Sequence, residues 1–130
     1  MVILFDQFHL PENIFDIIFS TEQQAMVAKL LIAHLKRNSG VIGKTEMSVF
    51  ANQLHDGTVI EITRGEAPFK KTERIKVSYN KRQFYDRILT PMKSMGMIDY
   101  DLYKKNYIIS DRFQKVLMKI GLMWNKEMAG

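Results

Sequence analysis

The feature that most constrains the fold is the stretch 80–109, which has the pattern of one helix followed directly by a short β-hairpin. Asn80 is a typical N-cap residue, and apolar side chains recur after it at helical spacing, at Phe84, Ile88, Met92 and Met95. Gly96 is the expected C-cap. Two short strands are predicted next, at 97–101 and 107–109. Because no linker separates helix from hairpin, we expect one folding unit.

The residues before this stretch predict three more helices. A short helix over Ile14–Ile18 is expected at the end of an N-terminal segment 1–19. A helix over 21–36 follows an N-cap at Ser20, and apolar residues on more than one of its sides indicate burial on most of its surface. The third helix, over 44–55, has one apolar stripe, formed by Met47, Phe50, Ala51 and Leu54.

The last predicted helix begins at Ser110-Asp111 and has two apolar edges. Its main stripe consists of Phe113, Leu117, Ile120 and Trp124. Its second edge consists of Val116, Met118, Leu122 and Met123. A domain of this size should not need both edges, so we expect a homodimer through the helices 21–36 and 111–128. The alternative is that segment 1–19 covers the second edge within one chain.

Residues 58–78 are expected to form a basic β-hairpin or a flexible basic loop. The excess positive charge of the chain lies in an overlapping stretch. The stretch 64–87 holds eight of the 19 basic residues and three of the 14 acidic ones, so it accounts for the whole net charge of +5. Such a cluster is typical of a surface that contacts nucleic-acid phosphates, although a solvated basic hairpin is the alternative. The candidate phosphate-binding residues of this arm are Arg64, Lys70, Lys71, Arg74 and Lys76.

The helix after Asn80 presents a polar face opposite its apolar stripe. At 100° per residue this face contains Arg82, Gln83, Asp86, Thr90 and Lys93. Arginine and glutamine are side chains that can make bidentate contacts to base edges in the major groove. Free amides at the helix N-terminus favour a phosphate, which adds Tyr79, Asn80 and Lys81 as candidates. The hairpin turn adds Lys104, Lys105 and Asn106.

In this order of elements the chain resembles the winged helix-turn-helix superfamily. The resemblance is carried by residues 78–111: the helix opened by Ser78–Phe84, its end at Met95-Gly96-Met97-Ile98, and the tyrosine-containing hairpin. It implies a mainly helical α+β fold, with a single winged-helix domain over 1–130 and its core over 21–128. In that fold 97–109 would be the wing, and 58–78 would be an extra basic hairpin or loop inserted before the recognition helix.

Two features depart from the pattern of this superfamily. The helices of a helix-turn-helix are normally joined by three or four residues, whereas here the insert separates His55 from Asn80. Either the insert is a DNA-binding arm, or the helix 44–55 is not the partner of the helix after Asn80. Pro91 lies inside the proposed recognition helix, so we expect a kink near Arg87–Leu89.

The predicted function is binding of double-stranded DNA, as a sequence-specific regulator of transcription. A replication accessory protein of a plasmid or virus would make the same contacts, and a winged-helix module that binds an acidic protein partner is the alternative from another class. We expect no enzyme, no cofactor and no metal site, since no spacing of acids or histidines supports one. The chain has no cysteine and no long apolar run, which favours a cytoplasmic protein without a membrane partner.

Overall fold

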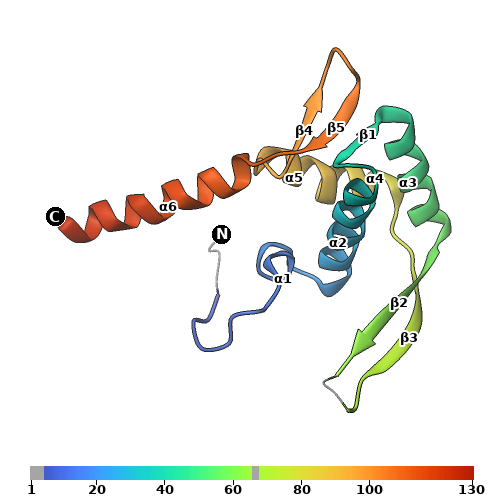
Figure 1. The fold of residues 1–130 in the computed structure, drawn as a ribbon, viewed down its shortest axis with the longest axis horizontal. Coiled ribbons are helices and arrows are strands. Elements are labelled where there is room, and N and C mark those ends of the chain that lie inside the picture. The colour runs from blue at the N-terminus through green and yellow to red at the C-terminus, as the bar shows by residue number, and fades with distance from the viewer. Residues whose placement is uncertain (1–4, 66–67) are drawn as a thin grey trace.

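The computed structural model describes residues 5–65 and 68–130, and its fold is α+β and mainly helical, with small antiparallel sheets (Figure 1). In chain order the elements are α1 (Ile14–Ile18), α2 (Glu22–Arg37), β1 (Val41–Gly43), α3 (Lys44–Asp56), β2 (Thr58–Arg64), β3 (Lys71–Val77), α4 (Lys81–Phe84), a π-helical turn (Tyr85–Leu89), α5 (Thr90–Ser94), β4 (Ile98–Asp101), β5 (Asn106–Ile109) and α6 (Arg112–Ala129). Every helix and both hairpins expected from the sequence are therefore present. Residues 1–4 of the predicted N-terminal segment lie outside the described residues.

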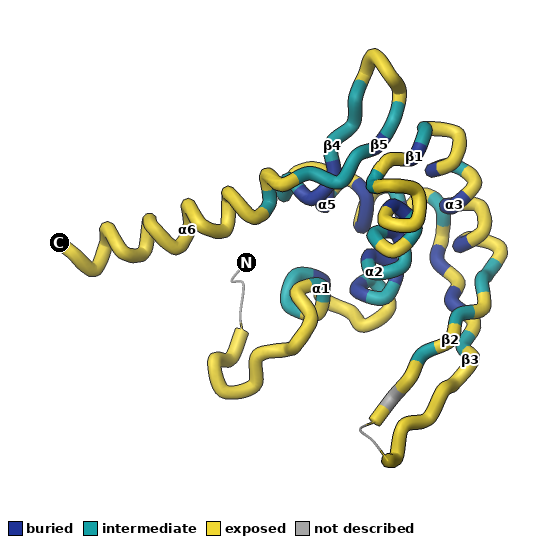
Figure 2. Tube along the Cα trace, viewed as in Figure 1, coloured by how far each residue is buried: buried dark blue, intermediate teal, exposed yellow. Residues whose placement is uncertain are grey.

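Helix α2 forms the centre of the core. Val27, Ala28, Leu31 and Leu35 have no solvent exposure, and further residues of α2 are partly buried, as its apolar pattern predicted. Figure 2 shows the buried segments of α3 and α5 around it. The N-cap prediction was one residue early. Thr21, not Ser20, caps α2, because its Oγ1 accepts from the amide of Gln24 at 3.1 Å.

A strand that the sequence analysis did not predict completes the larger sheet. This strand, β1, pairs antiparallel with β5, which also pairs with β4, so the order is β1-β5-β4. Ile42 of β1 is buried opposite Tyr107. The loop before β1 joins the same sheet through the amide of Ile109, which donates to the carbonyl of Gly40 at 2.9 Å. The sheet therefore anchors the base of the β4–β5 hairpin to the end of α2.

The insert 58–78 is a β-hairpin rather than a flexible loop. Strands β2 and β3 pair over their whole length, from Thr58 opposite Val77 to Arg64 opposite Lys71. Figure 1 shows the hairpin projecting from the body at the end opposite to β4–β5. One side of it, with Ile60 and Ile75, packs against the core.

Helix α6 extends away from the body and ends far from it (Figure 1). None of its residues, all of which the structure describes, is buried. The main stripe expected for this helix is largely in solvent, since Leu117, Ile120 and Trp124 are 44%, 55% and 65% exposed. Only Phe113, in the first turn, packs against the core.

Gly96 fixes the point where α6 leaves the body. It adopts φ +87°, and a Cβ at this position would lie 3.0 Å from the Cβ of Arg112 and from the amide nitrogen of Phe113. That amide donates to the Gly96 carbonyl at 3.0 Å. Met95 is the C-cap of α5, so the C-cap predicted at Gly96 was one residue late. Gly96, the next residue, contacts the first turn of α6 as closely as only glycine permits.

Candidate nucleic-acid interface

The candidate recognition helix, formed by α4, the π-helical turn and α5, is held against α3 at its N-terminus. Asn80 is the N-cap as predicted, since its Oδ1 accepts from the amide of Gln83 at 3.1 Å. The amide of Lys81 donates to Nδ1 of His55 in α3 at 3.2 Å. The rings of Phe50 and Phe84 are also in contact, tilted by 54° with centroids 5.6 Å apart. Helix α3 is therefore the direct partner of α4, despite the inserted hairpin between them.

The irregularity predicted at Pro91 is present as a π-helical turn. The amide of Thr90 donates to the carbonyl of Tyr85, five residues earlier, and proline itself has no amide to donate. The extra residue per turn allows the consecutive side chains of Ile88 and Leu89 both to be buried. The helix is continuous through this turn, because Leu89 and Thr90 keep right-handed helical backbone angles.

The predicted polar face is exposed along the whole recognition helix. The exposed residues of this face are Arg82, Gln83, Asp86, Thr90 and Lys93, all expected from helical spacing. Arg87, which the spacing placed beside the apolar stripe, is exposed as well. The guanidinium Nε of Arg82 lies 3.9 Å from Asp86, and both side chains are mostly in solvent. An exposed pair of this kind contributes little, so Arg82 can exchange Asp86 for another acceptor at small cost.

Two candidates at the start of the helix are less accessible than the sequence implied. Tyr79 is 7% exposed and belongs to the core, so its ring is not part of the interface. Lys81 is half-buried, and its Nζ lies 3.4 Å from Oγ of Ser48 in α3. Two of the first helical amides, those of Lys81 and Gln83, already have acceptors within the protein. A phosphate at this end would therefore meet fewer free amides than the pattern predicted.

The β2–β3 hairpin divides the basic arm between its two faces. Residues directly opposite each other share a face, which places Arg74 and Lys76 with Glu61 on the exposed outer face. Nε of Arg74 lies 3.2 Å from Oε1 of Glu61, in an exposed ion pair. Lys71 is on the opposite face near the tip, and Lys70 lies in the turn. Arg64 pairs with Lys71 through the backbone, and its side chain lies outside what the structure describes.

The base of this hairpin is fixed next to the recognition helix. The amide of Tyr79 donates to the carbonyl of Leu54 at 2.9 Å, and Nε2 of Gln23 in α2 donates to the carbonyl of Ser78 at 2.7 Å. The side chain of Lys76 packs over Gly57, the residue that ends α3. These contacts make the hairpin an extension of α3 with a defined direction, which a flexible loop would lack.

The turn between β4 and β5, the hairpin predicted to be the wing, has a defined conformation. Oδ1 of Asp101 accepts from the amides of Tyr103 and Lys104, at 2.9 and 3.1 Å. The amides of Lys104 and Tyr103 hold the pKa of Asp101 below its ordinary value, so the carboxylate form is favoured. Lys105 adopts φ +53°, and its carbonyl accepts from the amide of Lys44 at the start of α3. The turn is therefore braced both internally and against α3.

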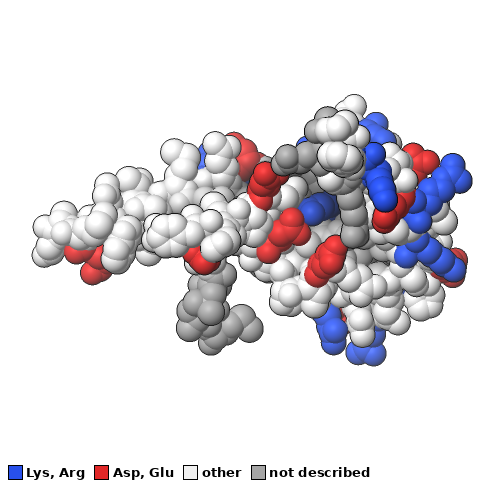
Figure 3. Space-filling view, turned by 90° about the horizontal axis from the view of Figure 1, so that it is seen from below, with Lys and Arg blue, Asp and Glu red and all other residues white. Residues whose placement is uncertain are grey.

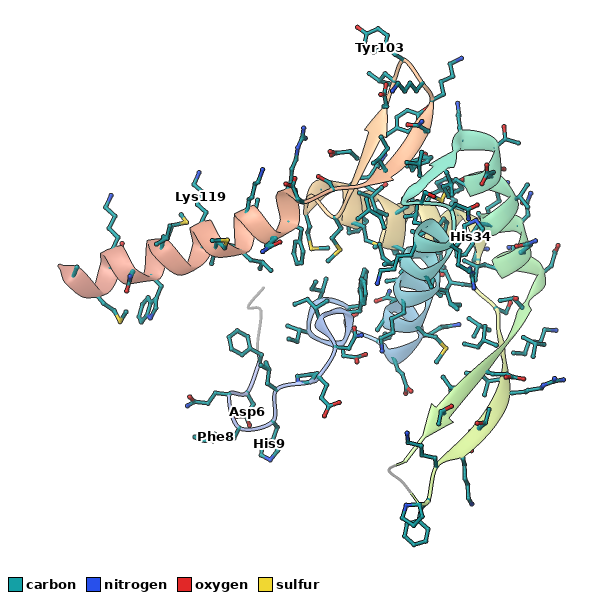
Figure 4. All side chains as sticks on the ribbon, in the orientation of Figure 1. Asp6, Phe8, His9, His34, Tyr103 and Lys119 are labelled. Carbon is teal, nitrogen blue, oxygen red and sulfur yellow. The ribbon has the colours of Figure 1, made fainter. Side chains whose placement is uncertain are left out.

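The tip of the β4–β5 hairpin differs at two residues from the predicted set of Lys104, Lys105 and Asn106. Lys104 and Lys105 are exposed as expected, whereas Asn106 is the first residue of β5, is half-buried, and has a buried Oδ1 without a hydrogen-bond partner among the described residues. Tyr103, which the sequence analysis passed over, is 97% exposed at the tip (Figure 4). The other hairpin has the same pattern, because Phe69-Lys70-Lys71 matches Tyr103-Lys104-Lys105 and Phe69 is 81% exposed. An aromatic residue followed by two lysines was a signal already present in the sequence.

The two ends of the molecule differ in charge on one of its faces. On the face seen from below, lysine and arginine lie mostly over the body and the β2–β3 side, while the visible side of α6, on the left, shows mainly uncharged atoms (Figure 3). Within the described ranges, no group of three or more histidines and acids is placed to hold a metal ion. None of the helices in those ranges combines the length and apolar character needed to cross a membrane.

Comparisons with models of known protein families, with curated proteins and with solved structures find no match to this chain.

Proposed function

We propose that this protein is a winged-helix protein that binds double-stranded DNA and acts as a sequence-specific regulator of transcription. The observation that carries the proposal is the exposed polar face of the recognition helix, α4–α5, which is held against α3 and leads directly into the β4–β5 hairpin. A helix of this kind inserts into the major groove when its partner helix and wing keep it in a fixed orientation.

The arrangement of elements supports a winged helix. Helices α3 and α4 are in direct contact, as the two helices of a helix-turn-helix are, and the insert between them leaves that contact intact. The hairpin after Gly96 occupies the position expected of the wing. Strand β1 pairs with β5 and stiffens the base of this wing.

The charged and polar residues support a division of labour between base reading and phosphate binding. In this proposal Arg82 and Gln83 read base edges, because both are exposed in the first turns of the recognition helix and both can bond bidentately. Lys70, Lys71 and Lys76 contact phosphates, which supply affinity without sequence information. Arg87 and Lys93 on the same helix are placed to add further phosphate contacts.

The two hairpin tips support a contact beyond phosphates. Tyr103 at one tip and Phe69 at the other are exposed aromatic rings, each followed by two lysines. Apolar side chains at such positions can wedge between base steps from the minor groove, while the lysines bind the flanking phosphates. The two hairpins project from opposite ends of the body, so they would reach the duplex on either side of the recognition helix (Figure 1).

The experiment that tests the proposal is a charge reversal of Lys70, Lys71 and Lys76 to Glu, with duplex binding measured by fluorescence anisotropy over a range of salt concentrations. We expect the parent protein to bind duplex DNA, and the variant to lose affinity and to lower the slope of log K against log salt by roughly 2 to 3. A matched control reverses Lys115, Lys119 and Lys126, three exposed lysines of α6.

The control variant should keep a slope close to that of the parent protein, because α6 is not part of the proposed interface. Equal losses in both variants would show that only the total charge matters, which contradicts a defined interface. No duplex binding by the parent protein at physiological salt would overturn the proposal and favour a module that binds an acidic protein.

A further inference from the structure

We propose that α6 forms an antiparallel pair with α6 of a second copy of this chain, and that its C-terminal half occupies the apolar groove between α1 and the base of α6 in that copy. The dimer itself does not depend on DNA binding. Only its consequence for the spacing of DNA half-sites, given below, rests on the proposed function.

The first observation is the apolar stripe along α6. Its residues fall within a sector of roughly 140° at 100° per residue and continue the spacing set by Phe113: Val116, Leu117, Ile120, Met123, Trp124 and Met128, each 44–65% exposed. Glu127, near the C-terminal end of the helix, lies in the same sector. The alternation of four- and three-residue steps through Leu117, Ile120 and Trp124 is the spacing of a helix–helix seam. A single chain gains nothing from such a stripe in water, because no residue of α6 is buried in the described structure.

The second observation is a groove at the base of the same helix. It has a volume of about 210 Å³ and is lined mainly by apolar side chains: Ile14 and Phe15 of α1, Ile32 of α2, Met97 before β4, Ile109 of β5 and Phe113 in the first turn of α6. Phe113 belongs to both the groove and the stripe, so the two surfaces are continuous. Each chain therefore carries the apolar stripe along α6 and, at the base of the same helix, the apolar groove.

An antiparallel pair brings these two surfaces together. With 18 residues α6 is about 27 Å long, so an antiparallel partner helix that starts at one base ends near the other. Met123, Trp124 and Met128 of one copy then reach the groove of the second copy, and the same contact is repeated by the two-fold axis. Self-complementarity of this kind is the reason for choosing a second copy over another protein as the occupant.

The area of the stripe is suitable for a stable dimer. Its exposed side chains amount to on the order of 600 Å² per chain, close to the ~800 Å² that each partner contributes to an interface of standard size. The groove supplies the remainder. The N-terminal segment adds Phe5, Phe8 and Leu10, which are more than half exposed. Phe8 lies on the side of α6 away from Lys119 (Figure 4).

The charges of α6 do not oppose this pairing. Its four basic residues, Arg112, Lys115, Lys119 and Lys126, lie together beside one edge of the stripe and outside it. In Figure 4, Lys119 points away from the side on which α1 and Phe8 lie. The basic side chains of two antiparallel copies therefore stay in solvent on the outer faces of the pair.

An amphipathic basic helix with one tryptophan also has the composition of a helix that binds an anionic membrane surface. The direction of the stripe favours a helix as the occupant. Phe113, the first residue of the stripe, lines the groove together with Ile14 and Phe15 of α1, so a flat bilayer along the stripe would meet α1 as well. A second helix fits beside α6 without this obstruction.

For the proposed DNA function, the dimer would set the spacing of two half-sites. Overlap along about 27 Å places the two bodies at opposite ends of the helix pair. This separation is similar to the ~34 Å between half-sites one DNA turn apart. The expected site is therefore a palindrome with half-site centres about one turn apart.

The test is the mass of the full chain in solution without DNA, measured by light scattering after size exclusion and by sedimentation over 1–100 µM. We expect a dimer, and we expect Ile120→Glu/Trp124→Glu to raise its dissociation constant by roughly 100-fold or more, because two charges enter the seam. The matched control is Met118→Glu/Leu122→Glu, with the same spacing and similar exposure on the other side of α6. It should remain dimeric. Circular dichroism should show that both variants keep the fold of the body.

The orientation is tested by single cysteines in this cysteine-free chain. The two copies of residue 120 meet near the two-fold axis of an antiparallel pair, so Ile120→Cys should form a disulfide between chains on oxidation. The two copies of residue 128 lie about 24 Å apart, far beyond disulfide reach, so Met128→Cys should not. Cross-linking of both variants would indicate a parallel pair and contradict the proposal.

The single tryptophan provides a direct readout of burial. Emission of Trp124 should shift to longer wavelength as the parent protein is diluted below its dissociation constant. A monomer at 100 µM would overturn the dimer, as would equal loss of dimer in both double variants. A monomer whose Trp124 emission shifts only with anionic vesicles would assign the stripe to a membrane surface instead. Loss of DNA binding by a protein that still dimerises would contradict only the proposed function.

Discussion

The recognition helix α4–α5 and the terminal helix α6 have the same pattern in the sequence and opposite environments in the structure. Each has a polar N-cap position and an apolar stripe that starts with phenylalanine. In the recognition helix Phe84, Ile88 and Met92 are fully buried. In α6 the corresponding stripe is exposed except at its first turn.

The difference between these two helices shows that an amphipathic pattern alone does not determine where a helix packs. An apolar stripe indicates that a helix has a partner, and it does not indicate whether that partner lies in the same chain. For α4–α5 the partners are α2 and α3, which follow one another in sequence and form the core. For α6 the described chain offers a partner only to Phe113. The exposed stripe is therefore the stronger evidence for an interaction between molecules.

The largest expected effect is a difference between Ile88 in the stripe of α4–α5 and Ile120 in the stripe of α6. Ile88→Ala should lower the free energy of unfolding by about 2–5 kcal/mol, because it removes a fully buried side chain from the core. Ile120→Ala should change it by less than about 0.5 kcal/mol in dilute protein, because Ile120 is 55% exposed. Urea denaturation at 1 µM measures both. Similar values for the two variants would contradict the contrast between the helices.

Two glycines should respond to alanine with opposite signs. Gly96→Ala should destabilise the fold by about 1–3 kcal/mol, because φ is positive and the new Cβ would press on Arg112 and Phe113. Gly121 lies within α6 with no atom near its Cβ position, so Gly121→Ala should stabilise that helix by about 0.5–1 kcal/mol. Thermal unfolding and helical circular dichroism report the two effects. Destabilisation by Gly121→Ala would mean that α6 is packed more closely than described.

The two N-caps should differ by a smaller amount. Asn80→Ala should cost about 1 kcal/mol, because the side chain accepts the amide of Gln83. Asp111→Ala should cost no more than about 0.5 kcal/mol, because the side chain makes no capping hydrogen bond and only an exposed ion pair with Lys115. Chemical denaturation compares the two. A larger loss at Asp111 would show that the start of α6 is held by more than the contact at Gly96.

The smallest expected effect concerns the turn of the β4–β5 hairpin, which connects α5 to α6. The pKa of Asp101 is lowered by the amides of Lys104 and Tyr103, so its contribution to stability is present above its unfolded pKa. That contribution should be lost as pH falls through the lower, folded pKa. Amide NMR signals of Tyr103 and Lys104 should move over this acidic range while those of α4 stay fixed. At neutral pH the amide signals of Tyr103 and Lys104 should also differ between Asp101→Asn and the parent protein. Identical signals would contradict the hydrogen bonds described.

The sequence predicted most of the helices because periodic apolar residues determine both their existence and their buried face. Strand β1 was not predicted, because Val41-Ile42-Gly43 is too short to show an alternating pattern. The strand is stabilised by pairing with β5, which lies far along the chain. The environment of Tyr79 also could not be read from the helix pattern. It lies between β3 and α4, and its backbone contact with Leu54 turns the ring into the core.

For the candidate interface, the sequence predicted which residue types are present better than it predicted how they are arranged. The polar face of the recognition helix follows directly from helical spacing, which the π-helical turn shifts only near Ile88 and Leu89. The hairpin register decides which arm residues share a face, and that register depends on seven cross-strand pairs that sequence spacing alone does not fix. The exposure of Tyr103 depends on the length of the wing turn, which the prediction had centred on Lys104-Lys105-Asn106.

The most direct test of the central claim is selection of duplexes from a random pool by the full chain, followed by anisotropy on the selected site and a scrambled duplex at physiological salt. The account predicts a preference of at least ~1,000-fold for the selected site. It also predicts that Arg82→Ala/Gln83→Ala reduces this preference while binding of scrambled DNA changes little. No enriched site, or a preference that is unchanged in the double variant, would contradict sequence reading by the face of α4–α5.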